Sequence, residues 1–196
     1  MKVAVTGTPG TGKTTAVERV EANLDAMDFD AADLDAADLD AADLDAVDLD
    51  VVHLNDVIRE EGLHEGRDET RDSLVADLDA VSEYLSGREN LLVESHLAHH
   101  FDADRVVVLR CHPDELRRRL HERGEPDAKI EENVESEALD IVLAEAVDRH
   151  GMDRVYELDA TERSPGEVAA EIEAVLANER DPGAGIVDFT DAIELQ

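Results

Sequence analysis

The run Gly7-Thr8-Pro9-Gly10-Thr11-Gly12-Lys13-Thr14 has the spacing of a phosphate-binding loop: a glycine, four further residues, and then Gly-Lys-Thr. A strand pattern over residues 2–6 leads into this run, and a helical pattern over residues 14–21 leads out of it. The glycines allow the backbone to fold around an anion with its amide hydrogens pointing inward, and the start of the helix adds the positive end of its dipole. The sequence therefore predicts a phosphate site in which Lys13 reaches the phosphates and the Thr14 hydroxyl holds Mg²⁺.

The chain is strongly acidic. Its 196 residues include 51 Asp and Glu but only 18 Lys and Arg, which gives a formal net charge of -33. Such a surface repels nucleic-acid phosphates, so we expect no strong direct binding to nucleic acid. Like charges on one surface also repel one another, and molar salt shortens the screening length to about 3 Å. The acid excess extends through the helices outside the repeat described below, which favours adaptation to a salty cytoplasm over an ordinary protein with one acidic insert.

The single cysteine, Cys111, excludes a disulfide within the chain and follows the apolar run 106–109, which favours a buried, unreactive thiol. No apolar stretch is long enough to span a bilayer, and the chain opens with a strand pattern rather than the apolar segment of a signal peptide. We therefore expect a cytoplasmic protein with no membrane partner.

Residues 25–50 contain a repeat of Asp-Ala-Ala-Asp-Leu in which the leucines recur at every fifth position. Five residues turn a helix by about 500°, so these leucines form no single stripe on a helix, and they do not alternate as strand residues do. The pattern is similar to that of pentapeptide-repeat β-helices, although about four repeats would complete only one coil. Calcium binding is a weaker alternative because the glycine and glutamate spacing of an EF-hand is absent. We expect an acidic excursion on the surface.

Along the rest of the chain, short apolar runs alternate with helical patterns. Strands are predicted at residues 2–6, 51–54, 91–93, 105–109 and 154–158, and helices at 12–24, 56–61, 73–85, from 113 to the break at 123–124, at 128–150, and from 164 onwards. Residues 63–72 form a polar stretch. This alternation predicts the α/β class with three layers, in which helices flank a five-stranded parallel sheet with right-handed crossovers. Active residues of such folds gather at the carboxyl ends of the strands.

At that edge we expect an acid and a histidine from one strand. Glu94 ends the apolar strand 91–93, at a place where an acid can hold Mg²⁺ or its water, and His96 points to the same face two residues later. A histidine there can orient a nucleophile or water. The alternatives are an ion-paired Glu94 and a histidine cluster, with His99 and His100, that reflects local composition. A zinc site lacks a recognised ligand spacing.

The arginines add a second set of charges. Arg59 lies on the helix after the second strand, and Arg119 and Arg123 lie at the end of the helix after the fourth strand. Phosphoryl transfer depends on positioning and on neutralising charge, so an arginine clamp suits the acceptor phosphate and further arginines suit the transferred group. For Arg117 and Arg118 we favour pairing with the many surface acids.

With these motifs in place, the chain resembles the archaeal branch of the adenylate kinase isoenzyme 6 family, which comprises P-loop kinases also implicated in maturation of the small ribosomal subunit. The matching segments span most of residues 1–178 and are 7–15, 56–61, 93–96, 108–113, 119–124, 129–133 and 135–140. The phosphate-binding loop alone is generic. Its combination with the Glu-x-His segment and the Arg-Gly pair is specific.

The resemblance implies a fold of the nucleoside-monophosphate-kinase type, in which residues 1–178 form the kinase domain and residues 179–196 a C-terminal tail. Within the domain it implies an AMP-binding segment at about 53–76 and a lid at about 122–132. The implied reaction is ATP + AMP = 2 ADP with Mg²⁺, accompanied by ATPase activity. ATP phosphates would lie at Gly10, Gly12, Lys13, Thr14 and Thr15.

The remaining residues receive their roles by the same resemblance. Arg59 would bind AMP, Arg123 would belong to the lid and contact ATP, and Arg119 would act in catalysis beside Lys13. Glu94 and His96 match an acid-x-histidine motif whose acid is often Asp. Because Glu94 is longer, contact with Mg²⁺ through water is an alternative to direct contact. The repeat at 25–50 departs from the family by lengthening a surface connection, which costs little closure entropy.

Two other functions remain open at this point. The chain could act chiefly as a nucleotide-switched ATPase that assembles a small-subunit ribosomal protein or pre-ribosome, because its acidic surface suits a basic protein partner. Alternatively, the repeat could be a binding module of its own.

Overall fold

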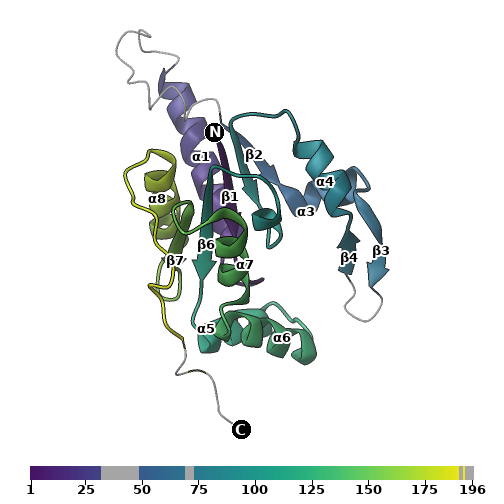
Figure 1. The fold of residues 1–196 in the computed structure, drawn as a ribbon. Helices are drawn as coiled ribbons and strands as arrows, with labels where there is room; N and C mark the ends of the chain where they lie inside the picture. Colours follow the sequence, from purple (N-terminus) through teal and green to yellow (C-terminus); the bar gives the residue numbers. More distant parts are fainter. Residues whose placement is uncertain (32–48, 69–72, 190–191, 193–196) are drawn as a thin grey trace.

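The computed structural model describes residues 1–31, 49–68, 73–189 and 192. The core is a five-stranded parallel sheet with the strand order β2-β5-β1-β6-β7. Its strands are β1 (Lys2–Thr6), β2 (Asp50–His53), β5 (Leu91–Glu94), β6 (Arg105–Arg110) and β7 (Val155–Asp159). The helices are α1 (Lys13–Ala31), α3 (Leu54–Glu60), α4 (Leu78–Leu85), η1 (Ala98–His100), α5 (Pro113–Glu122), α6 (Asp127–Ala138), α7 (Ile141–His150) and α8 (Pro165–Leu176). This confirms the predicted three-layer α/β fold (Figure 1).

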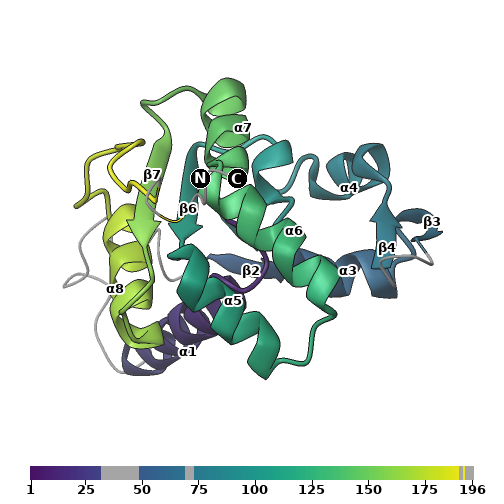
Figure 2. The same ribbon diagram turned by 90° about the horizontal axis from the view of Figure 1, so that it is seen from below.

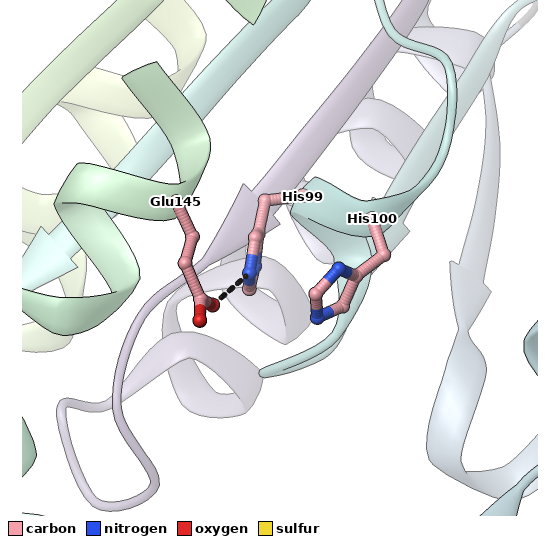
Figure 3. Close-up of side chains that lie close together, drawn as sticks. All are labelled: His99, His100 and Glu145. Atoms are coloured by element: carbon pink, nitrogen blue, oxygen red, sulfur yellow. Dashed lines mark hydrogen bonds and ion pairs between the residues drawn. The ribbon is translucent and has the colours of Figure 1, made fainter. Parts of the chain in front are cut away.

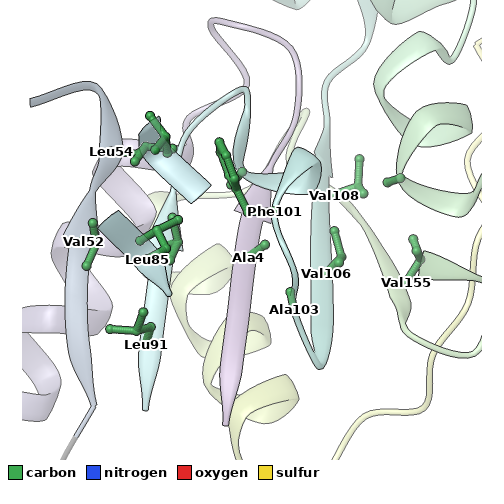
Figure 4. Close-up of a cluster of buried hydrophobic side chains, with 14 of the residues drawn as sticks. Ala4, Val52, Leu54, Leu85, Leu91, Phe101, Ala103, Val106, Val108 and Val155 are labelled. Carbon is green, nitrogen blue, oxygen red and sulfur yellow. The ribbon is translucent and has the colours of Figure 1, made fainter. Parts of the chain in front are cut away.

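Alternating side chains on the strands supply a separate core on each face of the sheet. Val107 and Leu109 of β6 pack with α1 and α8, whereas Val106 and Val108 pack with the layer formed by α3, α4, η1 and α7. Figure 4 shows the second of these clusters. Strands buried on both faces read as continuous apolar runs, which explains why β5 and β6 were evident from the sequence.

Helices α5 and α6 lie across the carboxyl ends of the strands (Figures 1 and 2). They enclose a small core of their own, made of Cys111, Leu116, Leu120, Ile130 and Val134. The predicted burial of Cys111 is confirmed, and this burial raises the pKa of its thiol to about 12. Among the helices in the described ranges, none combines the length and the apolar character that crossing a membrane requires.

The predicted helix at 73–85 is wrong in its first part, and the polar stretch before it is not a simple loop. Strands β3 (His64–Asp68) and β4 (Ser73–Ala76) pair as an antiparallel hairpin beside the main sheet. The helical pattern was misleading because Leu74 is exposed and contributes nothing to a core stripe. Helix α4 begins only after Asp77, whose carboxylate accepts a hydrogen bond from the amide of Ala80.

The long helix predicted at 128–150 is also wrong, because it is two helices. The chain turns at Asp140, which has a left-handed φ of 55°, between α6 and α7. The Asp140 carboxylate pairs with Arg110 at the end of β6, and the turn lets α6 cross the strand ends while α7 returns along the sheet. The apolar periodicity continued through the turn and concealed it.

The ends of two further segments differ from expectation. Helix α1 continues seven residues beyond the predicted end at Leu24, into the start of the repeat, whereas the central part of the repeat, 32–48, lies outside the described residues. In the predicted C-terminal tail, Gly183 bridges to Tyr156 of β7 and Phe189 is buried. Part of this segment therefore packs on the domain.

Candidate functional site

The glycines of the loop between β1 and α1 occupy positions that no other residue fits. Gly7, Gly10 and Gly12 have φ values of 138°, 99° and 100°. A Cβ on Gly7 would lie 2.3 Å from the carbonyl oxygen of Leu109, and one on Gly10 would lie 2.7 Å from Leu116. The loop is therefore closely packed between the end of β6 and helix α5, with the backbone conformation that phosphate-binding loops require.

Lys13 is folded back into this loop. Its Nζ donates hydrogen bonds to the carbonyl oxygens of Gly7, at 2.8 Å, and Thr8, at 3.1 Å. Burial lowers the pKa of Lys13 to about 8, although the nearby carboxylates of Glu94 and Glu137 oppose the shift. The ammonium is thus poorly hydrated and gains more from a phosphate oxygen than an exposed lysine would.

Glu94 lies at the centre of the strand edge, with its side chain almost fully buried. One carboxylate oxygen accepts a hydrogen bond from the Thr14 hydroxyl at 3.2 Å, and the other lies 3.2 Å from Nδ1 of His53. The predicted closeness of Glu94 and Thr14 is therefore observed. Hydroxyl and carboxylate oxygens are the ligands that Mg²⁺ prefers, so Thr14 and Glu94 together fit that ion.

His53 was not singled out in the sequence analysis, although a signal was present. It ends β2 and stands in register with Glu94, which ends the neighbouring parallel strand β5. Polar residues that end adjacent parallel strands meet at one edge of the sheet. The other ring nitrogen of His53 lies 3.8 Å from Glu21 of α1, so His53 sits between two acids.

His96 lies near Lys13, and in the described part of the chain no hydrogen bond or ion pair joins its side chain to Glu94. Its carbonyl oxygen accepts a hydrogen bond from the Thr6 hydroxyl at 3.3 Å, which ties the segment after β5 to the end of β1. The residue retains an exposed surface. Partial burial of the ring, followed by the charge of Lys13, lowers the pKa of His96, so its imidazole is neutral at physiological pH.

Arginines line a pocket beside the loop. Arg118, Arg119, Arg123 and Arg163 surround a cavity of about 270 Å³ that also includes Gly10, Gly12 and Thr15. Glu115 also lines the cavity and pairs with Arg118 and Arg119, and Arg163 pairs with Glu171, so acids offset part of this positive charge. The structure thus brings the predicted Arg119 and Arg123 to the loop.

Arg119 is held firmly at this pocket. Its guanidinium donates to the carbonyl oxygens of Thr11 in the loop and of Ala160 and Thr161 after β7. Arg119 also pairs with Glu115 at 2.8 Å, and Arg117 and Arg118 form ion pairs with acids on α5 and α6, as predicted for them. Arg119 therefore links three segments of the site.

Arg59 stands apart from these groups. It is 65% exposed at the end of α3, and its guanidinium pairs with Asp56 at 2.8 Å. Across the described ranges, no hydrogen bond or ion pair joins Arg59 to the loop. It lies in the last turn of α3, the helix that directly follows β2.

The histidine cluster after β5 is accounted for by ordinary hydrogen bonds. His99, His100 and Glu145 gather between η1 and α7, with candidate ligand atoms all within 4.8 Å of one another (Figure 3). Both nitrogens of buried His99 already have partners, Thr6 at 2.8 Å and Glu145 at 3.1 Å. Burial lowers the pKa of His99 to about 4, and the neutral ring is hydrogen-bonded to Thr6 on one side and to Glu145 on the other. The cluster ties η1 to β1 and α7.

The chain is similar in sequence to one protein family and to several archaeal proteins. A family model described as "AAA domain" matches residues 3–140. Three archaeal relatives carry the name "Putative adenylate kinase". The chain is 59% identical to that of Natronomonas pharaonis, covering 97% of this chain and 99% of the relative. It is 52% identical to that of Halobacterium salinarum, over 98% and 100%, and 40% identical to that of Methanothermobacter thermautotrophicus, over 96% of each.

Solved structures agree on the fold. A shikimate kinase from Bacteroides thetaiotaomicron matches with a TM-score of 0.55 and 16% identity, over 90% of this chain and 98% of that one. A gluconokinase from Sinorhizobium meliloti matches with a TM-score of 0.50 and 19% identity, over 91% and 92%. At these identities the likeness concerns the fold alone, which is the P-loop NTPase α/β fold.

Proposed function

We propose that this protein transfers the γ-phosphoryl group of ATP to AMP and yields two ADP. The premise is that the chain belongs to the "AAA domain" family and, within it, to the archaeal branch of the adenylate kinase isoenzyme 6 family. One observation carries the proposal: in a chain of net charge -33, the phosphate-binding loop adjoins a pocket lined, among the residues that the structure describes, by four arginines and only one acid, Glu115. Such a concentration of cations suits a reaction in which negatively charged phosphates must be held together.

The residues of the loop would hold the donor. Gly10, Gly12, Thr14 and Thr15 would cradle the ATP phosphates with their amides, and Lys13 would exchange its two carbonyl partners for phosphate oxygens. Thr14 and Glu94 would hold Mg²⁺, Glu94 directly or through water. When bound, that ion neutralises charge on the β- and γ-phosphates.

The transfer itself breaks the bond from Pγ to the bridging oxygen of ADP while an oxygen of the AMP phosphate forms a new bond to Pγ. Arg59 would hold the acceptor phosphate beside β2. Arg119 and Arg123 would neutralise the charge of the transferred group, Arg119 from its fixed position and Arg123 from the lid. His96, neutral and close to Lys13, would orient the acceptor or, in its absence, a water.

The decisive experiment is a donor and acceptor screen with Mg²⁺ in molar potassium chloride, with the product nucleotides read directly. We expect AMP to accelerate ATP consumption and to appear as ADP. Arg59→Ala should raise the KM for AMP while leaving ATP binding unchanged. Arg88→Ala is the matched control, because Arg88 also pairs with a surface aspartate but lies at the opposite end of β2. If AMP does not accelerate ATP consumption and Arg59→Ala changes nothing, the kinase proposal fails.

The acidic surface favours a second candidate role. ATPase activity could drive release of a basic small-subunit ribosomal protein during maturation of the subunit in a salty cytoplasm, because a surface of this charge complements a basic protein rather than RNA. Saturable association with such a protein in molar salt, weakened by ATP, would support this role. Absence of saturable association would remove it without affecting the kinase proposal.

A further inference from the structure

A buried acid from helix α6 contacts the phosphate-binding loop. Oε2 of Glu137 accepts a hydrogen bond from the hydroxyl of Thr8, the residue after the first glycine. Both side chains are buried, with exposures of 2% for Glu137 and 1% for Thr8. The carbonyl of the same Thr8 accepts from Nζ of Lys13 and from the amide of Thr11. Thr8 therefore joins the loop to α6, as Thr11 joins it to Arg119 of α5.

Glu137 is fixed in turn by the end of strand β6. Its other oxygen, Oε1, accepts from Nε of Arg110 at 2.8 Å and from the amide of Cys111 at 3.0 Å. Arg110 is itself almost fully buried and pairs with Glu157 of β7 at 2.6 Å. An acid in this setting cannot move without breaking charged hydrogen bonds in a site that excludes water, so its position is rigid.

We propose that Glu137 is a positioning residue for the phosphate-binding loop, and that it joins the loop to helix α6, whose first half belongs to the lid. The inference rests on the proposed function for its assignment of the lid. Helix α6 starts at Asp127, inside the proposed lid at 122–132, and Glu137 lies one residue before its end. Movement of the lid over ATP therefore acts on a helix whose far end is anchored to Thr8, and the loop and the lid respond to the same nucleotide together.

The hydroxyl of Thr8 is the part of this contact that can be removed most cleanly. Thr8→Val keeps the size and branching of the side chain but leaves one oxygen of Glu137 without a donor, whereas Thr8→Ser keeps the hydroxyl. We expect Thr8→Val to raise both the Kd and the KM for ATP about tenfold, which is the scale of a lost hydrogen bond to a charged group. The KM for AMP and kcat should change less than the KM for ATP, and Thr8→Ser should restore most of the ATP affinity.

Glu137→Gln and Glu157→Gln form a matched pair. Each removes one buried carboxylate charge from Arg110 with little change in volume, but only Glu137 contacts the loop. Both variants should unfold at lower temperature, and only Glu137→Gln should weaken ATP binding measured by calorimetry. Where Glu137→Gln fails to fold, the comparison of Thr8→Val with Thr8→Ser decides the matter.

Three results would overturn the inference: an unchanged Kd for ATP in Thr8→Val, a Thr8→Ser variant as impaired as Thr8→Val, or equal weakening of ATP binding by Glu157→Gln. These measurements use ATP binding, so they remain informative if AMP is not the acceptor. Loss of the proposed function would instead appear as ATP binding without AMP-dependent formation of ADP.

Discussion

At the scale of single residues, the site depends on side chains that hold other side chains. Glu94 is recognisable in the sequence because it ends an apolar run. The sequence does not show that its two oxygens are shared between Thr14 and His53. His53 and Glu137 become visible only once strand register and helix placement bring distant segments together, because neither belongs to a short motif.

The contact with His53 should matter for the metal site. In His53→Ala one oxygen of Glu94 loses its side-chain partner, and we expect the Mg²⁺ concentration for half-maximal activity to rise about tenfold, the usual effect of removing a group that orients a metal ligand. Binding of Mn²⁺ in the presence of ADP, followed by electron paramagnetic resonance, should weaken in parallel. His121→Ala, an exposed histidine on α5, is the control. Equal metal dependence in both variants would contradict the role of His53.

Lys13 should make ATP binding depend on pH. Its pKa of about 8 in the free protein lies below the ordinary value of 10.5, so the amine starts to lose its proton near pH 8. ATP favours the ammonium form, so binding above pH 8 must take up a proton, and affinity should fall by up to about tenfold per pH unit there. Below pH 7 no uptake is expected.

Calorimetry in buffers of different ionisation enthalpy measures this proton uptake. Lys13→Arg keeps the charge at all these pH values, so any ATP binding that it retains should show no uptake. A wild-type protein that binds ATP between pH 8 and 9 without taking up a proton would contradict the assignment to Lys13.

At the scale of elements, prediction from sequence succeeded where one segment forms one element with its own start and stop signals. The strands β5 and β6 contain the apolar runs 91–93 and 106–109, and α8 opens with Ser164 and Pro165. Prediction failed where partners outside the segment decide. Strand β4 is stabilised by its pairing with β3, and the turn at Asp140 by the ion pair of its carboxylate with Arg110. The apolar periodicity within a single segment does not reveal either of these contacts.

The start of α8 offers a clean test of a local signal. The Ser164 hydroxyl accepts from the amide of Glu167, and the Glu167 carboxylate accepts from the amide of Ser164, which completes a capping box. We expect Ser164→Ala to lower the free energy of unfolding by about 1 kcal/mol, measured by denaturant titration in molar potassium chloride. Ser82→Ala, an exposed position within α4, should leave it unchanged or slightly higher. Equal effects of the two changes would show that the cap contributes nothing.

At the scale of the whole molecule, the acidic repeat should be dispensable. Helix α1 packs on the sheet through Ala16, Val17 and Val20, strand β2 pairs with β5, and lengthening a surface connection costs little closure entropy. We expect replacement of 32–48 by a short Gly/Ser linker to leave ADP formation and the free energy of unfolding nearly unchanged in molar salt. Loss of folding would show that the repeat packs in the core. A deletion variant that folds but no longer binds a protein that the full chain binds would show that the repeat is a binding module.

The net charge of -33 should make stability depend steeply on salt. Folding brings these charges closer together than they are in the unfolded chain, so their repulsion opposes folding until salt screens it. Between about 0.1 M and about 1 M potassium chloride the screening length falls from roughly 10 Å to roughly 3 Å, and we expect the free energy of unfolding to rise across that range. Denaturant titrations in potassium chloride and in tetramethylammonium chloride of equal ionic strength distinguish general screening from specific binding of K⁺. Screening alone predicts the same increase in the free energy of unfolding in both salts. A binding site for K⁺ predicts a larger increase in potassium chloride. A free energy of unfolding that does not rise with either salt would refute adaptation of this surface to salt.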